Sequence, residues 1–112
     1  MTGYSRGDVV LVSFIFADGT GAKSRPAVIL SSDAYNTGRD EAIIAAVTSR
    51  TDRVLVGDYL IDDWQGAGLL FPSVATGIIR TIKQGMIARK LGSIPAPDMA
   101  ALDSQLKLAL GL

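Results

Sequence analysis

The 112-residue sequence predicts a small, mostly β barrel of the α+β class, with one short helix and one helix at the end of the chain. Short runs of β-branched and aromatic residues recur between glycine-containing turns, a pattern typical of strands in a small β structure. Only the stretch after Pro97 has the apolar spacing of an amphipathic helix. Because the chain is long enough for one core and too short for two, we expect a single domain over residues 1–112.

Three strands are expected in the first half of the chain. Residues 9–16 are rich in β-branched and aromatic side chains and follow a turn at residues 6–8. Residues 26–31 follow a glycine-containing loop, and Pro26 is tolerated because the first residue of a strand need not donate to the ladder. Residues 42–48 form a continuous apolar run, so this strand is expected to be buried on both faces.

Shorter elements are expected in the middle of the chain. Residues 34–38 follow a cap at Ser32 and form at most one helical turn. Residues 54–61 are expected to give one or two strands broken at Gly57, and residues 74–82 are expected to give one longer strand. Together with the first three, these segments make five or six strands.

Two helices are expected near the end of the chain. Residues 86–91 predict a short helix that ends at Gly92, since glycine suits the position that follows a helix. A longer helix begins at Pro97-Asp98 and stops at Gly111. Its apolar residues fall on one stripe, which is expected to pack against the sheet or a partner subunit. The stripe consists of Met99, Leu102, Leu106, Ala109 and Leu110.

Composition excludes several classes of function. The formal net charge is zero, which disfavours a protein that binds DNA without sequence preference. The absence of cysteine excludes disulfides, thiolate chemistry and cysteine metal sites. The absence of histidine removes the commonest general base and the commonest metal ligand, so we expect catalysis, if any, without a metal or other cofactor.

The sequence also predicts where the protein works. No apolar run approaches about 20 residues, the length needed to cross a membrane as a helix. The first residues lack the apolar core of a signal peptide. We therefore expect a cytoplasmic protein with no membrane segment.

Two polar strand ends are the best candidates for an anion-binding site. Arg25 precedes the strand at residues 26–31, where it is either a solvated strand cap or a fixed cation that holds an anionic substrate. Thr48, Ser49 and Arg50 end the buried strand, where hydroxyls and a guanidinium are good phosphate donors. An ordinary polar strand end is the alternative. The combination of Arg25 with Thr48 and Ser49 favours a phosphate site.

Two other features have structural interpretations that compete with functional ones. Gly19 and Gly21 suggest a phosphate cradle, but neither a P-loop nor a dinucleotide fingerprint follows, so a flexible connection is expected. Asp62 and Asp63, with Asp58 nearby, suggest either a divalent cation site or carboxylates that cap a turn. No calcium-loop spacing is present, which favours the turn.

Several segments, in order along the chain, resemble the MazF/PemK family, the toxins of type II toxin–antitoxin pairs. The first two segments and the Thr48-Ser49 pair are the most specific. The resemblance extends over roughly residues 6–110. The matching segments are Arg6-Gly7-Asp8-Val9, Lys23-Ser24-Arg25-Pro26-Ala27-Val28-Ile29-Leu30-Ser31, Ala46-Val47-Thr48-Ser49, Ile79-Arg80-Thr81-Ile82 and Lys90-Leu91-Gly92.

The resemblance implies a fold, an assembly and an activity. The fold is an SH3-like β-barrel of the MazF/CcdB type with a C-terminal helix, assembled as a homodimer. The activity is sequence-specific, metal-independent cleavage of single-stranded RNA, such as mRNA, which leaves 2′,3′-cyclic phosphate and 5′-hydroxyl ends. RNA carries its own nucleophile, the 2′-hydroxyl, so a protein without histidine suits this reaction. The implied partner is a cognate antitoxin with an acidic, partly disordered tail.

The resemblance also assigns roles to residues. The family's catalytic arginine falls on Arg25, its catalytic threonine falls on Thr48, and Ser49 lies beside them as a phosphate or backbone contact. In the family, the loop between the first two strands contributes to base recognition. Here residues 17–24 carry few base-reading side chains, which leaves the recognised RNA sequence open. The expected RNA-binding residues are Lys23, Ser49, Arg50, Arg80 and Phe16.

Two other functions remain open at this stage. CcdB-like toxins use the same barrel to bind DNA gyrase and cut nothing. A non-catalytic SH3-like binding module is the second alternative. Both are distinguished from a nuclease by whether Arg25 and Thr48 are required for RNA cleavage.

Overall fold

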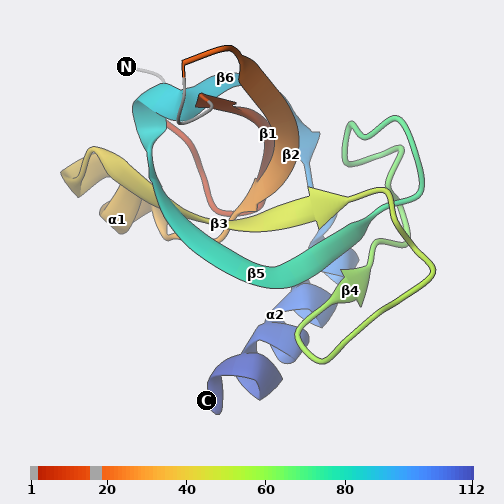
Figure 1. Cartoon of the computed structure of the whole chain (residues 1–112). Coiled ribbons are helices and arrows are strands. Elements are labelled where there is room, and N and C mark those ends of the chain that lie inside the picture. The colour runs from red at the N-terminus through yellow and green to blue at the C-terminus, as the bar shows by residue number, and fades with distance from the viewer. Residues whose placement is uncertain (1–2, 16–18) are drawn as a thin grey trace.

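Six antiparallel strands form one curled sheet in the computed structural model of the chain, which describes residues 3–15 and 19–112 (Figure 1). Across the sheet, the strands follow the order β4-β5-β3-β2-β1-β6. The outer strands β4 and β6 are not paired with each other in the described part of the chain, so a closed barrel is not confirmed. In chain order, the elements are β1 (Asp8–Ile15), β2 (Ala22–Ile29), α1 (Asp33–Gly38), β3 (Glu41–Thr48), β4 (Tyr59–Leu60), β5 (Val74–Lys83), the 3-10 turn η1 (Gln84–Met86), β6 (Ile87–Ser93) and α2 (Ala96–Leu110).

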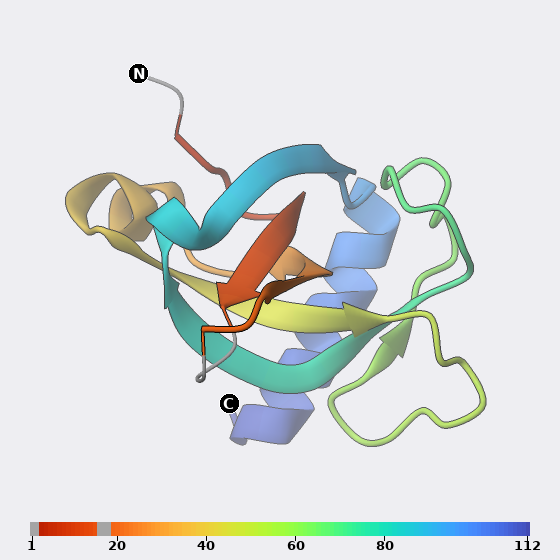
Figure 2. The ribbon, with the colours of Figure 1, turned by 45° about the horizontal axis from the view of Figure 1, so that its top comes forward.

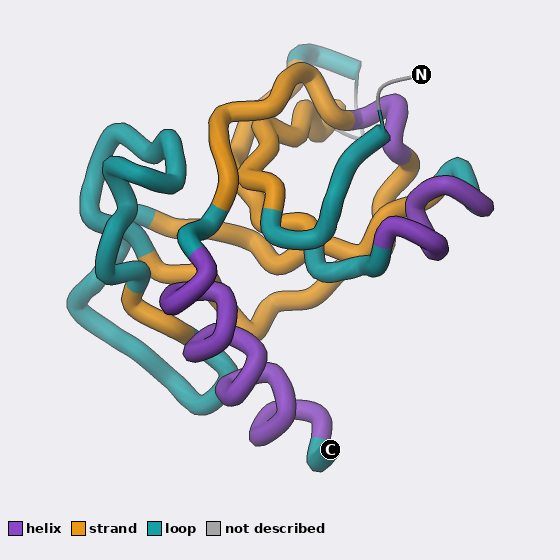
Figure 3. Tube along the Cα trace, turned by 180° about the vertical axis from the view of Figure 1, so that it is seen from behind, coloured by secondary structure: helices purple, strands orange, loops and turns teal. Residues whose placement is uncertain are grey.

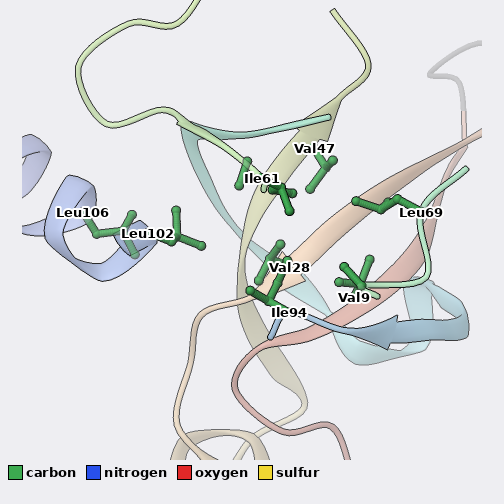
Figure 4. Close-up of a cluster of buried hydrophobic side chains, with 10 residues drawn as sticks. Val9, Val28, Val47, Ile61, Leu69, Ile94, Leu102 and Leu106 are labelled. Carbon is green, nitrogen blue, oxygen red and sulfur yellow. The ribbon is translucent and has the colours of Figure 1, made fainter. Parts of the chain in front are cut away.

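The sheet buries an apolar cluster on each of its two faces. One cluster draws on β1, β2, β3, β5 and β6 of the curled sheet that Figure 2 shows. Its residues alternate along β1 and β2 with those of the second cluster, so the two clusters lie on opposite faces. The other lies under α2, where Leu102 and Leu106 meet Val9 and Val28 of the first two strands (Figure 4). Successive residues of a strand point to opposite faces, which explains why an apolar run such as that of β3 is buried on both sides.

The first three expected strands are confirmed, with one correction at β2. The strand begins at Ala22, ahead of the expected start, so Pro26 lies inside it. Residues 22–26 pair only with β1, Ala27 and Val28 pair with both β1 and β3, and Ile29 pairs with β3. Pro26 therefore lies in a one-sided part of the ladder, where a residue without an N–H donor can be accommodated.

The prediction of a helix at residues 86–91 is wrong. Strand β6, which begins at Ile87, occupies this segment and pairs with β1. Gly92 lies inside that strand and does not end a helix. A Cβ at Gly92 would lie 2.4 Å from the carbonyl oxygen of Ala67, so the glycine permits close contact between two backbone segments. In the middle of the chain, only Tyr59–Leu60 forms a strand, and residues 54–56 belong to a loop.

Both remaining helices are confirmed. The side chain of Ser32 caps α1 by accepting a hydrogen bond from the Tyr35 N–H. Helix α2 lies across the outside of the sheet, as seen from behind in Figure 3, and ends at Gly111 in the left-handed conformation. Leu102 and Leu106 are buried, but the stripe becomes exposed by Leu110. Neither helix in the described ranges has the length and apolar character needed to span a membrane.

A buried carboxylate fixes the start of α2 to the rest of the fold. Asp98 is 3% exposed and accepts hydrogen bonds from the Tyr59 hydroxyl, the Asp62 N–H (3.0 Å) and the Asp63 N–H (3.1 Å). Burial alone would raise the pKa of Asp98, but these hydrogen bonds outweigh it and lower the pKa below its ordinary value. Burial and the bond to Asp98 raise the pKa of Tyr59 to about 12.

We expect Asp98→Asn to lower the free energy of unfolding by about 1.5–3 kcal/mol, because hydrogen bonds to a buried ionised group are lost. Because the pKa of Asp98 is lowered from 3.8, its contribution is present above pH 3.8 and disappears as the pH falls through the lowered pKa. Urea unfolding of both proteins between neutral and acid pH measures this.

The matched control is Asp103→Asn, which makes the same chemical change on the exposed side of α2, where Asp103 pairs with Arg6. A surface ion pair contributes about 0–1 kcal/mol, so the control is expected to be close to wild type. Equal losses in the two variants would contradict the role given to Asp98.

Candidate functional site

The candidate site lies where β2 and β3 stop pairing. The two strands are in register at only three positions, from Ile29↔Ile44 to Ala27↔Ala46. Extending the same register by two residues sets Arg25 opposite Thr48. Beyond Ala27 the ladder ends, and a groove of about 570 Å³ opens between the strands.

Positive charge is concentrated along this groove. Among the described residues, five basic side chains line it, against a single carboxylate, that of Asp58. A neutral protein thus has a local cationic surface, which suits an anionic ligand. The five basic residues are Lys23, Arg25, Arg50, Arg53 and Arg80.

Strand geometry places Arg25 and Lys23 in the groove. Alternate residues of β2 share a face, so both lie on the face that carries Ala27 and Ile29 deeper in the sheet. The same face therefore changes from buried apolar to exposed cationic along a single strand. In the described part of the chain, Arg25 is exposed and forms no ion pair, so its guanidinium is available to a ligand.

Thr48 offers a hydroxyl at the opposite wall. Its Oγ1 accepts a hydrogen bond of 3.1 Å from the Arg50 N–H. This bond uses the oxygen as an acceptor and leaves the hydroxyl proton free to donate. Thr48 also pairs with Val74 of β5, which fixes its backbone in the sheet.

The loop at residues 50–58 is held against β5 by one carboxylate. Asp58 accepts hydrogen bonds from the Leu55 N–H (2.9 Å) and the Gly77 N–H (2.7 Å). Gly57 has a positive φ of 93°, and a Cβ on Gly77 would lie 3.3 Å from the carbonyl carbon of Gly57. Both glycines are needed for this close approach.

Two of the three aspartates, Asp58 and Asp63, accept backbone hydrogen bonds as the turn interpretation expects. Besides the two bonds of Asp58, the carboxylate of Asp63 accepts from the Gly66 N–H at 2.9 Å. Among the residues that the structure describes, no group of three or more acidic side chains is arranged to hold a metal ion. Through these hydrogen bonds, the carboxylates of Asp58 and Asp63 stabilise local structure.

Arg50 is held loosely. Its side chain forms an ion pair with Asp52 at 2.9 Å, in which the two side chains are 70% and 66% exposed. The hydrogen bond from Arg50 lowers the pKa of Asp52. Because such exposed pairs contribute little to stability, Arg50 can exchange Asp52 for an anionic ligand at low cost.

An aromatic side chain that the sequence did not single out also lines the groove. Phe14 lies under Arg80, whose guanidinium carbon is 4.8 Å from the ring centroid. The strand pairing of Phe14 with Lys23 brings it to the site. Phe16, the aromatic residue expected to contact RNA, lies outside the described residues. Alternation would place residues 14 and 16 of the expected strand on one face, but the link from Phe14 to the site required its pairing with Lys23.

A second hollow lies on the other side of Arg25 and Thr48. It has a volume of about 380 Å³ and shares both residues with the groove. Ser49 lines this second hollow, whereas Lys23, Arg50 and Arg80 line the groove. The structure thus brings every described candidate to one continuous surface, with Arg25 and Thr48 between its two halves.

The curled sheet, the terminal helix and the cationic groove define a small β domain with a positively charged surface. Residues 5–110 match the family model of PemK-like, MazF-like toxins of type II toxin–antitoxin systems. The chain belongs to this family.

Solved structures of similar shape extend this comparison. A MazE–MazF complex from Deinococcus radiodurans has 24% identity and a TM-score of 0.80, covering 97% of each chain. An endoribonuclease with its cognate antitoxin from a mycobacterial species has 24% identity and a TM-score of 0.76, covering 97% of this chain and 96% of that one. The Mycobacterium tuberculosis toxin MazF-mt6 has 24% identity and a TM-score of 0.77, covering 94% and 97%. At these identities, the likeness establishes a shared fold.

We expect Asp58→Ala to free the loop at residues 50–58, because both of its backbone hydrogen bonds are lost. The free energy of unfolding should fall by about 1–3 kcal/mol, and the amide hydrogens of Leu55 and Gly77 should exchange faster. Native-state hydrogen exchange measures both. Asp62→Ala is the control, since no side-chain hydrogen bond joins Asp62 to this loop in the described residues. Unchanged exchange in Asp58→Ala would contradict the anchoring role.

Proposed function

We propose that this toxin is an endoribonuclease that cleaves single-stranded RNA, including mRNA. The phosphate at the cleavage point is held in the groove between β2 and β3. The observation that carries the proposal is that Arg25 and Thr48 line the same groove, together with four further basic side chains. Single-stranded nucleic acid is bound by grooves that combine positive charge along the backbone with aromatic faces for the bases. The relatives whose structures are called endoribonucleases support the same activity.

The proposed reaction uses the nucleophile of the RNA itself. The 2′-oxygen attacks the adjacent phosphorus, the bond from phosphorus to the 5′-oxygen breaks, and a 2′,3′-cyclic phosphate and a 5′-hydroxyl result. The proton of the 2′-hydroxyl passes to water, and the departing 5′-oxygen takes a proton from water. The protein supplies in-line positioning and stabilises the charge that develops on the phosphate. A metal ion has no required part in these steps.

Arg25 is the proposed electrostatic clamp. Its guanidinium is permanently charged and presents forked donors that match two phosphate oxygens. A guanidinium is a poor proton donor, which is why the protons are assigned to water. Thr48 is the second proposed catalytic residue, because its free hydroxyl proton can donate to the same phosphate and fix its orientation.

The remaining candidates are proposed RNA contacts. Lys23, Arg50 and Arg80 line the groove and suit neighbouring phosphates, and Ser49 suits a phosphate or backbone contact on the other side. The stacking role of Phe16 stays a prediction. Phe14, already under Arg80, is added as a stacking candidate.

The proposed partners follow from charge and exposed apolar surface. An acidic, partly disordered antitoxin tail would complement the five basic residues of the groove. A homodimer is supported by the exposed apolar end of α2, where Leu108 is 66% exposed and Leu110 is 59% exposed. We further propose that residues 1–112 form one domain, that its curled sheet is a variant of the SH3-like barrel, and that the protein acts in the cytoplasm.

We expect purified protein to cut a long single-stranded RNA at discrete positions in the presence of EDTA, with cyclic phosphate at the new 3′ ends. Arg25→Ala should lower the cleavage rate by about 10²–10³-fold, the usual cost of removing one donor that stabilises transition-state charge. Gel-based cleavage rates and mapping of the fragment ends measure these effects.

The matched control is Arg39→Ala, which removes a basic residue that pairs with Glu41 and lines neither hollow. Its cleavage rate should stay near that of wild type. Normal cutting by a folded Arg25→Ala protein would overturn the catalytic assignment. A folded wild-type protein that cuts no RNA would overturn the nuclease proposal and favour a gyrase-binding or other non-catalytic role.

A further inference from the structure

The second hollow, which we name the Phe71 hollow, differs in character from the groove. Its wall beyond Arg25 and Thr48 is mainly apolar, with Leu11, Leu69 and Leu91 among its side chains. Arg89 of β6 adds a second basic group, and none of the described residues that line the hollow is acidic. A ligand that fits this hollow is therefore partly apolar and partly anionic.

Two large apolar side chains stand exposed at its edge. Leu70 is 82% exposed and Phe71 is 63% exposed, and both line the hollow. Large apolar side chains that gather at a concave surface commonly mark a binding site. An exposed aromatic ring beside a basic groove is the arrangement on which a nucleic-acid base stacks.

The segment that carries Phe71 is fixed by its backbone. Gly68 has a positive φ of 85°, and a Cβ there would lie 2.2 Å from the carbonyl oxygen of Leu91. This glycine therefore lets residues 67–68 press directly on β6. The Ser73 hydroxyl donates a hydrogen bond of 2.7 Å to the Phe71 carbonyl oxygen, so the backbone is also fixed next to the ring. Phe71 is thus presented on a rigid support.

We propose that the Phe71 hollow holds the base of one nucleotide next to the cleaved phosphate, with Phe71 as its stacking face. This inference rests on the proposed nuclease function. A phosphodiester joins two nucleosides, and the two hollows lie on either side of the Arg25 and Thr48 pair that is proposed to hold that phosphate. One nucleoside extends along the cationic groove, and the other enters the Phe71 hollow.

The rest of the lining supports this placement. Arg89 lines the same hollow, so its guanidinium can neutralise the next phosphate of the RNA, on the far side of the held base from the cleaved phosphate. Leu11, Leu69 and Leu91 contact the apolar faces and edges of a base, and Ser49 offers a polar contact beside Thr48. Stacking is tolerant of base identity, so this position selects bases by size and stacking strength more than by hydrogen bonding.

Two experiments test the inference. In the first, cleavage rates and fragment ends of a long single-stranded RNA are compared for wild type, Phe71→Ala and Phe71→Trp. Loss of one stacking face is expected to weaken RNA binding, read from KM, by about 5- to 100-fold. The nucleotide preference on one side of the cut should also relax. Phe71→Trp keeps a stacking face and should restore binding. Leu60→Ala is the control, because Leu60 is 49% exposed and lines neither hollow.

In the second experiment, methyl NMR signals of Leu11, Leu69 and Leu91 are followed in wild-type protein during titration with a randomised pool of short 2′-O-methyl RNA oligonucleotides. These oligonucleotides cannot be cleaved by 2′-hydroxyl attack, so the measurement does not depend on catalysis. Ring-current shifts of the three leucines, lost in Phe71→Ala, support the inference even if the protein cuts no RNA.

Two results would overturn the inference while leaving the nuclease proposal in place. One is Arg25-dependent cleavage that is unchanged in rate and position in Phe71→Ala. The other is leucine methyl signals that stay still while groove residues shift, which would show that RNA occupies the groove without entering the Phe71 hollow.

Discussion

The site depends on the point at which β2 leaves β3. The ladder between them ends at Ala27↔Ala46, and only beyond that pair do the strands leave room for a ligand. On the opposite side of β3, β5 stays paired through an irregularity, where the Thr76 hydroxyl donates to the Ala46 carbonyl oxygen at 2.7 Å. On one side, β5 thus holds the β3 backbone, while on the other side β2 no longer pairs with it beyond Ala46. This arrangement fixes Thr48 at the wall of the groove. Full pairing of β2 with β3 would close the groove.

Charge and rigidity are supplied by different parts of the chain. The basic residues come from β2, the loop at residues 50–58 and β5, and they converge because those segments border the same gap. The carboxylates are used for structure: Asp58 ties the loop to β5, and Asp98 ties α2 to the turn at residues 62–63. A protein with no net charge presents a strongly cationic groove, because Asp58 is the single carboxylate among the described residues that line it.

The sequence predicted most of the strands, because their apolar runs are visible locally. Arg25 and Thr48 were candidates because each adjoins such a run, whereas their catalytic roles came from the family resemblance and stay a prediction. Prediction from the sequence failed where contacts between distant segments decide the outcome. The segment at residues 86–91 has no clear period, and its pairing with β1 made it a strand. Arg89 and Phe71 could not be joined to the site, because the approach of Gly68 to Leu91 is invisible along the chain. Phe14 required the register of β1 against β2.

The central claim is that Arg25 and Thr48 act on one phosphate. A double-mutant cycle in RNA cleavage tests it most directly, using Arg25→Ala, Thr48→Val and the combined variant, each checked for an unchanged fold. Residues that act as one unit have strongly non-additive effects, so the combined variant should be little slower than the worse single variant. Rate losses that multiply, as for two independent residues, would contradict a shared phosphate and with it the site described between β2 and β3.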